Sequence, residues 1–382
     1  MDLEKTTLST PQKDNNFTEI LIVLISVVVI SALVLGLVFG LSKDKDKDKV
    51  NSTNSTNSTN NTIDVLNSYN NTDELIEKYK VLNPTEVKPG MEKKIQNRLL
   101  TGFENWNRGF ETWKEWGNIL YTNESIYNVH GCRLNLKHYQ QAMDITLQQA
   151  DIFMGDFHNM LITDNFCGIH YDFITNGRKS RVMEFVRFKD YGDALGTRVS
   201  EGWGSTKDSS YDGLKNFQGD DESRVQEEQI FYVVNYQIHS NETDLKKKYP
   251  IKYKTEYIDQ NADEILNIIL EGFDKWNTGI NDYEDWVRNN YDSNANSSSL
   301  YERDRTREEY IKEMKELCET YEIKKKYFDN ILIRGNWAAL HYRYTREQKP
   351  LTGENIYAGD RMQFLKFEEK NGSLKIANSW TQ

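Results

Sequence analysis

A repeat at a spacing of 170 residues constrains the fold of this chain more than any other feature of its sequence. Seven residues between positions 102 and 121 recur 170 positions later, and two of the seven are tryptophans. The matched residues are Gly102, Phe103, Trp106, Asn107, Gly109, Trp116 and Tyr121 in the first copy, and Gly272, Phe273, Trp276, Asn277, Gly279, Trp286 and Tyr291 in the second. Self-similarity at a fixed period is the sequence signature of a repeated structural unit. The repeat therefore predicts that two copies of one small domain make up most of the chain.

The similarity extends from this motif to the C-terminus. The later matched pairs include His170 with His341, Tyr171 with Tyr342, Met183 with Met362, Phe185 with Phe364 and Trp203 with Trp380. A chain of 382 residues is also long enough for about two domains with additional segments. We expect the first domain, with a lead-in segment, at 72–205, a connector at 206–261 and the second domain at 262–382.

Each copy reads as helices followed by strands. Apolar residues at three- and four-residue spacing predict helices at 92–103, 106–121 and 136–150 in the first copy and at 262–273, 276–291 and 307–321 in the second. Short β-type runs separated by turn-forming pairs follow in the first copy at 159–163, 168–174, 182–188 and 195–203. A sheet that is apolar on one face must be covered, and helices on one face are the usual solution. The predicted fold class is α+β, with three helices packed on a curved antiparallel sheet in each copy.

An uninterrupted apolar segment precedes the repeat. Residues 20–41 carry no charge and are rich in Ile, Val and Leu, and a helix of that length spans about the 30 Å of a bilayer core. The run is longer than the apolar region of a signal peptide and ends directly in the charged residues 43–49. We therefore expect a short tail at 1–19 and one uncleaved transmembrane helix at 20–41, so that the membrane is a partner of this protein.

The segment at 42–71 is expected to be a disordered stalk, because its charged and Asn/Ser/Thr residues cannot bury a core. Two signals disagree on the membrane orientation. Four lysines between 43 and 49 favour a cytosolic location for the chain beyond the helix. Acceptor triplets for N-glycosylation favour the opposite side, and begin at Asn51, Asn54, Asn57, Asn60, Asn70, Asn123, Asn241, Asn296 and Asn371. We expect the globular part outside the cytosol as a glycoprotein, with the cytosolic location as the alternative.

Composition excludes some kinds of partner. The net charge of −11 and the lack of a basic stripe argue against nucleic acid, which is bound through clustered Lys and Arg. Cys132, Cys167 and Cys318 are too few and too widely spaced for a disulfide framework or a zinc site. We read them as buried small residues, with a single disulfide as the alternative. No metal or cofactor is expected.

Each copy opens with Gly-Phe-x-x-Trp, Thr352-Gly353 precedes a long strand, and the chain ends in the segment Ser373 to Trp380. With the order of elements, these features resemble the SnoaL-like polyketide-cyclase family of the nuclear-transport-factor-like cone-fold superfamily. The resemblance covers about 92–205 and 262–382 and is clearer in the second copy. It implies that each copy is a cone-like domain enclosing a pocket, in which some family members use an Asp or His as general acid or base.

Two residues of the second copy are the candidates for such a role. A general acid or base needs a titratable group beside the substrate, with a pKa adjusted by burial. His341 and Asp360 both carry titratable side chains. Asp360 also lies near the position where the family carries an acidic residue. The first copy has Arg181 there, so at most one domain would be active. The alternatives are a structural or interface role for His341 and a solvated turn for Asp360.

Aromatic residues are the candidates for ligand binding. Those expected to line the pockets are Trp276, Trp286, Tyr291 and Tyr342 in the second copy and Trp106, Trp116 and Tyr121 in the first. Large aromatic residues at helical spacing are also typical of a packed core, and Tyr and Trp favour sites where one end reaches a polar partner. Both interpretations remain open.

Strand alternation places His170 and His341 on the face opposite the more apolar one. Because the apolar face should meet the helices, we expect the histidine faces of the two sheets to pair within the chain. The first functional hypothesis is a membrane-anchored protein that binds a small apolar ligand or a protein partner without turnover. The alternative is a cyclase, isomerase or dehydratase that acts through the second domain.

Overall fold

A computed structural model describes residues 72–129, 132–137, 139–140, 143, 151–193, 195–204, 209–210, 232–254, 259–299 and 304–382. The expected tail at 1–19, transmembrane helix at 20–41 and stalk at 42–71 all lie outside these residues. The described part of the chain begins at Thr72, where the lead-in segment starts. Within the described part of the chain, no helix is long and apolar enough to cross a membrane.

The first half interleaves helices and strands. Its elements are α3 (Thr72–Lys78), β1 (Val81–Pro84), α4 (Met91–Asn107), α5 (Phe110–Leu120), β2 (Tyr121–Val129), β3 (Cys132–Asn135), β4 (Ile152–Thr163), β5 (Phe166–Thr175), β6 (Arg178–Asp190) and β7 (Thr197–Gly204). The expected order of helices first and strands last is wrong, because β1 lies between two helices of the first half and β2 and β3 precede its third helical segment. The helix expected at 136–150 is described only at five helical positions between 136 and 143.

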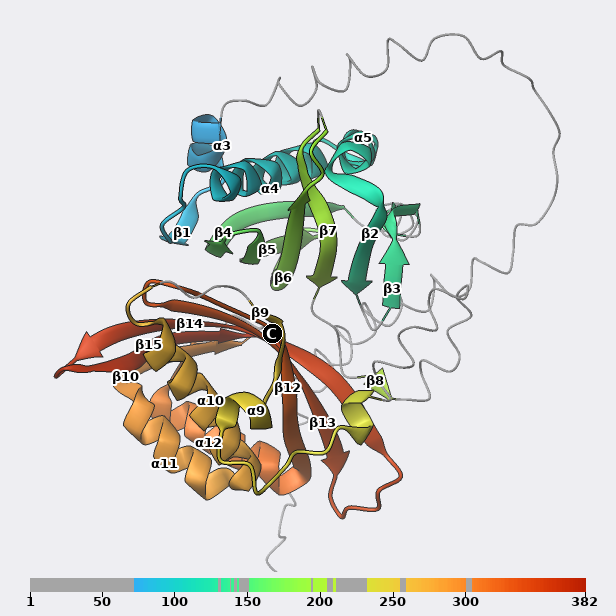
Figure 1. Ribbon diagram of the computed structural model, residues 1–382. Helices are drawn as coiled ribbons and strands as arrows, with labels where there is room; N and C mark the ends of the chain where they lie inside the picture. The colour runs from blue at the N-terminus through green and yellow to red at the C-terminus, as the bar shows by residue number, and fades with distance from the viewer. Residues whose placement is uncertain are drawn as a thin grey trace, which may run out of the picture.

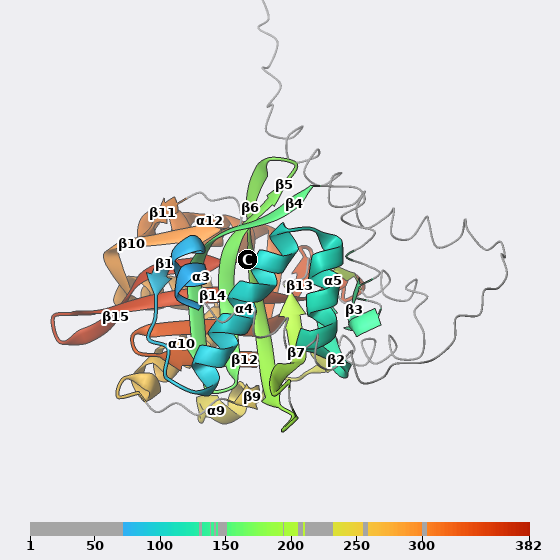
Figure 2. The ribbon, with the colours of Figure 1, turned by 90° about the horizontal axis from the view of Figure 1, so that it is seen from above.

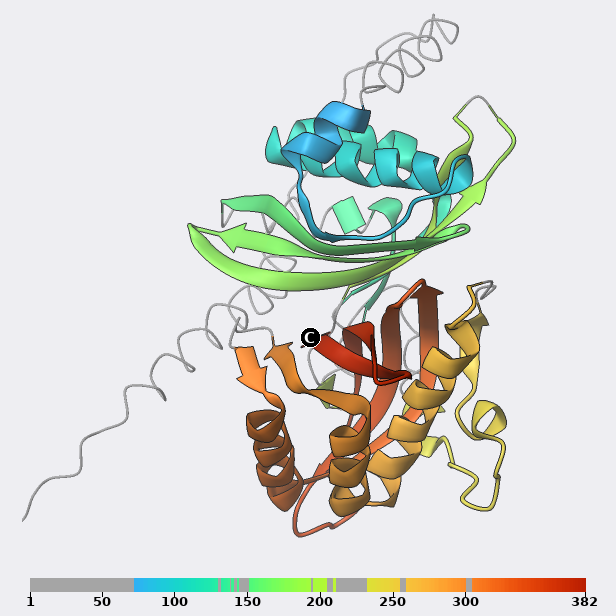
Figure 3. The same cartoon turned by 90° about the vertical axis from the view of Figure 1, so that its left-hand side faces the viewer.

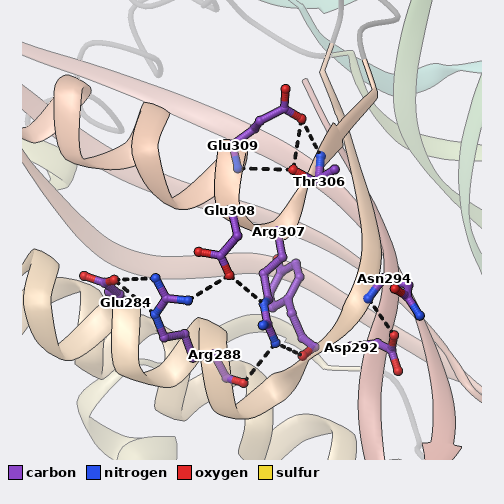
Figure 4. A network of polar contacts seen from close by, with 9 residues as sticks. Glu284, Arg288, Asp292, Asn294, Thr306, Arg307, Glu308 and Glu309 are labelled. Atoms are coloured by element: carbon purple, nitrogen blue, oxygen red, sulfur yellow. Dashed lines mark hydrogen bonds and ion pairs between the residues drawn. The ribbon is translucent and has the colours of Figure 1, made fainter.

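The second half repeats this order after the short strand β8 (Ser209–Ser210). Its elements are α9 (Leu245–Lys248), β9 (Ile251–Lys254), α10 (Ala262–Thr278), α11 (Ile280–Asn290), β10 (Tyr291–Ser299), β11 (Asp304–Thr306), α12 (Arg307–Thr320), β12 (Tyr321–Arg334), β13 (Trp337–Gln348), β14 (Ile356–Lys370) and β15 (Ser373–Thr381). The charged segment before α12 supplies a capping box, in which Thr306 and Glu309 satisfy each other's backbone N–H groups. Arg288 of α11 also bonds Glu308 at 2.8 Å, which holds the start of α12 against α11 (Figure 4).

The two sheets have the same order of equivalent strands. The first runs β1-β4-β5-β6-β7-β2-β3, and the second runs β9-β12-β13-β14-β15-β10-β11, with β8 paired to β14. The α+β class expected from the sequence is confirmed, but the fully antiparallel sheet is wrong. Strand β1 pairs with β4, β2 with β7, β9 with β12 and β10 with β15 in parallel. The two strands of each parallel pair are not joined by a tight turn. A long connection lies between them and returns the chain to the same end of the sheet, so that both strands run in the same direction.

The first two long helices of each half meet at a glycine. Gly109 has a φ of 124° and Gly279 a φ of 156°, and each lies between two helices. Side chains with a Cβ rarely adopt this conformation, so the glycine of the repeated motif is required by the turn. The helices expected to start at 106 and 276 therefore begin at Phe110 and Ile280, beyond these glycines.

The molecule has four layers, in which the helices of each half lie outside and the two sheets lie between them (Figures 1 and 3). Helix α4 runs across the outer face of the first sheet, beside α5 (Figure 2). Apolar residues of each helix layer and of the facing sheet side form one core per half, which includes Leu100, Phe157 and Ile169 in the first and Leu270, Phe328 and Leu340 in the second. The more apolar face of each sheet thus packs on its helices.

A third apolar cluster joins the opposite faces of the two sheets. It contains Leu161, Phe166, Met183, Phe185 and Trp203 of the first half, and Leu332, Ala339, Met362 and Phe364 of the second. Several members are equivalent residues of the repeat, as in an isologous interface between identical subunits. That the pairing persists in solution stays a prediction.

Candidate functional site

The repeated tryptophan at the end of the first long helix fastens that helix to the sheet. Trp106 Nε1 donates to the carbonyl oxygen of Ile152 at 3.1 Å, and Trp276 Nε1 donates to that of Ile323 at 2.9 Å. Both side chains are buried. These two residues were expected to bind a ligand, and the structure gives each of them the same structural contact.

The repeated asparagine next to this tryptophan bonds the following strand position. Asn277 Oδ1 accepts from the backbone N–H of Lys325 at 2.9 Å, and its Nδ2 donates to the carbonyl of the same residue at 2.8 Å. Asn107 makes both bonds to Met154, each at 2.8 Å. One side chain thus fixes the end of each helix against one strand residue, which places Met154 and Lys325 at equivalent positions inside their halves.

The second repeated tryptophan packs against the repeated glycine. A Cβ on Gly272 would lie 2.6 Å from the ring of Trp286, and a Cβ on Gly102 would lie 3.4 Å from that of Trp116. The glycine therefore lets α10 and α11 approach closely around a buried indole. The indole N–H of Trp286 has no hydrogen-bond partner among the described residues.

The predicted catalytic pair is in contact but lies between the two sheets. His341 Nδ1 accepts from Asn330 Nδ2 at 3.2 Å, so its Nε2 carries the proton that Asp360 Oδ2 accepts at 2.7 Å. His341 is 0% and Asp360 3% exposed, and the ring of Phe185 from the first half stacks on the imidazole at 5.7 Å. A substrate could reach the pair only if the sheets separated. Catalysis by His341 and Asp360 stays a prediction.

His170 occupies the equivalent place in the first half. Its ring stacks on Phe364 of the second half at 6.0 Å, and its Nδ1 bonds Asn159 at 2.9 Å. Burial lowers the pKa of His170 well below its ordinary value, and the nearby charges of His158 and Arg181 lower it further. A neutral imidazole at this position suits an apolar interface.

The charged residues around the two histidines have exchanged sign. His158 and Asp172 are bonded at 2.7 Å in the first half, where the second half has the ion pair of Asp329 with Arg343. Arg181 lies opposite Asp172 on the neighbouring strand of the first sheet, and Asp360 lies opposite Arg343 in the second. The two halves have therefore kept the histidine and changed its charged surroundings.

A carboxyl group lies inside the first half, on the side of the sheet that faces the helices. Glu184 of β6 accepts a hydrogen bond from the Tyr171 hydroxyl at 2.8 Å. Burial raises the pKa of the Glu184 carboxyl, whereas the hydrogen bond from Tyr171 and the nearby hydroxyl of Tyr127 oppose the rise. A carboxyl that is neutral over a wider pH range can both donate and accept a hydrogen bond.

Further tyrosines surround this carboxyl. The Tyr127 ring stacks on that of Tyr139 at 4.3 Å, and Tyr121 lies 6.0 Å from Tyr139 between ring centroids. The Tyr127 hydroxyl is buried without a hydrogen-bond partner at normal distance among the described residues. It lies near enough to Glu184 to lower the pKa of that carboxyl. One of the predicted ligand-binding residues, Tyr121, thus belongs to a polar cluster in an apolar interior.

The second half carries a lysine in its interior instead. The Nζ atom of Lys325 lies 4.6 Å from the ring centroid of Phe273, 4.8 Å from Trp276, 5.2 Å from Tyr283 and 5.4 Å from Tyr342. Two of these rings, Trp276 and Tyr342, were predicted to bind a ligand. The other two predicted residues of this half, Trp286 and Tyr291, extend the same aromatic cluster through Tyr283.

Sequence reasoning missed both Glu184 and Lys325. A signal for Glu184 exists, because alternate residues Val182 and Val186 of its strand are apolar and the glutamate interrupts that face. Lys325 gives no such signal, because it lies between Lys324 and Lys326 in what reads as a solvated basic run. Its inward position depends on the bonds from Asn277 and on a local irregularity of β12 after Lys325.

These features define an α+β protein with two helix-covered curved sheets, with Glu184 on the helix-facing side of the first and Lys325 on that of the second. No protein-family profile and no curated protein matches the chain. Similar solved structures include a putative SnoaL-like polyketide cyclase from a Jannaschia species, at 16% identity and a TM-score of 0.27, covering 33% of this chain and 90% of that one. A putative hydroxylase from Streptomyces galilaeus is similar at 14% identity and 0.26, covering 31% and 88%.

A ketosteroid isomerase-like protein from Erwinia carotovora atroseptica is similar at 11% identity and a TM-score of 0.26, covering 32% of this chain and 96% of that one. Each likeness spans about the length of one half. Identities and TM-scores this low carry no argument about activity. The functional conclusion therefore rests on the residues of this chain.

Proposed function

We propose that this protein binds a small, largely apolar ligand in the first half, without turnover, and that Glu184 anchors one polar group of that ligand. The observation that carries the proposal is the half-buried carboxyl of Glu184, which accepts a hydrogen bond from the Tyr171 hydroxyl at 2.8 Å on the side of the sheet that faces the helices. Ligand sites are mostly apolar with a few placed polar groups, and this cluster has that composition. The Tyr127 hydroxyl supports it, because it is a buried donor without a partner in the described part of the chain, and such a group costs free energy that a ligand can recover.

A thermal-shift screen of the full chain tests this proposal. Small aromatic ketones and phenols should raise the midpoint of unfolding, since a ligand that binds only the folded state stabilises it. Glu184→Gln should abolish the shift, and Glu111→Gln, an exposed glutamate on α5, should leave it unchanged. Equal shifts in both variants would contradict the proposal. Chemical conversion of the bound compound would instead favour the cyclase or isomerase alternative.

We also propose that residues 20–41 anchor the protein in a membrane and that the globular part lies outside the cytosol. The acceptor asparagines within the described residues support this orientation, since Asn123, Asn241, Asn296 and Asn371 are all exposed. A glycosyltransferase needs such access. Mobility on a gel before and after glycosidase is the measurement, in a host that glycosylates. A chain that shows no change, and that protease cannot reach in right-side-out vesicles, would indicate the cytosolic alternative.

The pairing of the two halves completes the proposal. A ligand-binding protein with internally paired sheets presents its helix layers outward and covers the inner faces of both sheets. Two equivalent ring contacts support a stable interface, because Phe185 stacks on His341 and its counterpart Phe364 stacks on His170. His170→Glu with His341→Glu should loosen the halves, because two charges would be buried without partners. Small-angle scattering of the double variant should show an increased radius of gyration. An unchanged radius would contradict the pairing of the two sheets.

A further inference from the structure

We propose that Lys325 is a nucleophilic amine that captures a small aromatic aldehyde or ketone as an imine inside the second half. This goes beyond the ligand site of the first half, because it uses a different residue, a different half and a covalent bond. The ligand class follows from the chemistry around the amine. A neutral amine attacks the carbon of a carbonyl group. The aromatic side chains around it can stack on a flat ring, which favours an aromatic compound.

The placement of the amine carries the argument. Lys325 Nζ lies within 5.4 Å of the ring centroids of Phe273, Trp276, Tyr283 and Tyr342, which come from α10, α11 and β13. Among the described residues, no carboxylate lies within ion-pair distance of this amine and no acceptor bonds it, whereas Lys324 pairs with Glu322. The Lys325 side chain is partly buried, so the interior position retains access to solvent.

The first half shows that packing does not require a lysine here. The equivalent residue is Met154, which the bonds from Asn107 hold as those from Asn277 hold Lys325. Met154 packs against Trp106 and Trp113, the equivalents of Trp276 and Tyr283. A flexible apolar side chain therefore fills this space without the cost of burying an amine. The chain tolerates that cost in one half only, which indicates a function for the amine.

The protonation state suits a nucleophile. Burial lowers the pKa of Lys325 to about 7, and the Cys318 side chain on α12 opposes this change. The faces of the aromatic rings also attract the ammonium form. The titratable side chains that face the amine are Cys318, Tyr283 on α11 and Tyr342 on β13, and the pKa of each is raised by burial, so that they are neutral near pH 7. A substantial fraction of Lys325 is then the neutral amine.

The covalent step needs no oxidant or reductant. The nitrogen lone pair forms a bond to the carbonyl carbon, and the carbonyl π pair moves to oxygen, which takes a proton. The resulting carbinolamine loses its hydroxyl with a second proton as water while the nitrogen lone pair forms the C=N bond. The nitrogen gives up its two protons overall, and the products are one imine and one water molecule.

Reductive trapping on the full chain tests the proposal. The chain is incubated with benzaldehyde at pH 7.5, cyanoborohydride reduces any imine to a stable benzylamine, and peptide mass spectrometry locates the label. Lys325 should be labelled at least tenfold faster than Lys324 and Lys326, its neighbours on the same strand. Uniform labelling of exposed lysines, or a Lys325 slower than its neighbours, would overturn the proposal.

Two variants and a pH series keep the test decisive. Lys325→Met copies the residue of the first half and should remove the fast label, whereas Lys326→Met should retain it. If Lys325→Met does not fold, labelling of the unaltered chain still decides, because the Lys325 rate should reach half its maximum near pH 7, far below the pH at which an ordinary lysine amine does so. Coincident pH profiles would refute the proposal. Glu184→Gln should leave the label unchanged, so failure of the ligand site in the first half is distinguishable.

Discussion

A Cβ on Gly168 would lie 3.1 Å from the Cβ of Ala339, so these equivalent residues of the two halves meet where the sheets touch. The rings of Phe364 and Phe185, themselves equivalent, lie 3.2 Å and 3.3 Å from the same point. Contacts between equivalent residues at one point are the mark of a pseudo-two-fold axis. These contacts have the form of an interface between identical subunits, and the pairing of the two halves in solution stays a prediction.

The close approach at Gly168 predicts that Gly168→Ala destabilises the protein by about 1–3 kcal/mol, the usual cost of overpacking. The added methyl group meets three neighbours that the opposing sheet and β6 hold in place. Gly117→Ala is the matched control, because its Cβ would lie 3.5 Å from the end of a flexible Gln140 side chain. Denaturant midpoints of the two variants make the comparison. A Gly168→Ala protein as stable as its parent would mean that the sheets are not closely packed.

A buried ion pair should be the strongest single link between the halves. Arg334 of β12 contacts Glu92 of α4 and also donates to the carbonyl oxygen of Ile162, and both charged side chains are buried. Removing one partner leaves a buried charge unpaired, which costs about 3–5 kcal/mol. We expect Glu92→Ala and Arg334→Thr each to lower the free energy of unfolding by that amount.

The repeat supplies the control for this pair. The positions equivalent to Glu92 and Arg334 carry Ala262 and Thr163, so the double variant with those residues should recover most of the loss. Replacing the exposed Arg288, which bonds Glu284 and Glu308 (Figure 4), by alanine should lower stability far less, because water and salt screen surface ion pairs. Additive losses in the double variant would argue against a direct interaction.

Glu184 predicts a distinct pH dependence. Burial raises the pKa of this carboxyl, so the folded state holds its proton to higher pH than the unfolded chain does. Stability is therefore lost as pH rises through the folded-state pKa and is fully present below the unfolded value. Glu184→Gln removes this loss and should melt higher than the parent at neutral pH, with a difference that shrinks toward acid pH. Gln363→Glu, the exchange at the equivalent position, should have the opposite effect. Calorimetry between pH 3 and pH 8 measures both, and a pH-independent difference would refute the burial of an ionisable carboxyl.

Asn277 predicts a link between the repeated motif and the lysine site. Its side chain makes two bonds to the backbone of Lys325 and one to the Tyr249 hydroxyl at 3.2 Å. Asn277→Ala leaves buried backbone groups without partners, at about 1–3 kcal/mol each. We expect lower stability and slower benzaldehyde labelling of Lys325, since the strand position is no longer fixed. Asn294→Ala, at an exposed position, is the control, and unchanged labelling in Asn277→Ala would separate the motif from the site.

The sequence by itself determined the duplication and the α+β class, because these follow from residue identity and local spacing. The expected order of helices first and strands last was wrong, because two strands come directly before the third helical segment of each half. Gly109 and Gly279 mark the helix junctions, since only glycine suits their φ values, and strand alternation sorts His170 and His341 from the apolar face. The parallel strand pairs and the inward position of Lys325 could not be predicted from residue identity and local spacing. Strand direction depends on where a helical connection returns the chain. An inward lysine depends on a side-chain bond from a distant asparagine and on an irregularity of the strand.

Only the tertiary structure decided what each matched pair of the repeat does. Trp106 and Trp276 read as ligand-binding residues, and their Nε1 atoms donate to strand carbonyls that lie 46 and 47 residues further along the chain. His341 and Asp360 read as an acid and base, and the first half covers them with Phe185. Glu184 and Lys325 belong to no prediction from the sequence, and each lies half-buried on the helix-facing side of its sheet beside aromatic side chains. The physical reason is common to all three cases: burial and partners, which set the pKa and the access of a side chain, come from elements far away in the sequence.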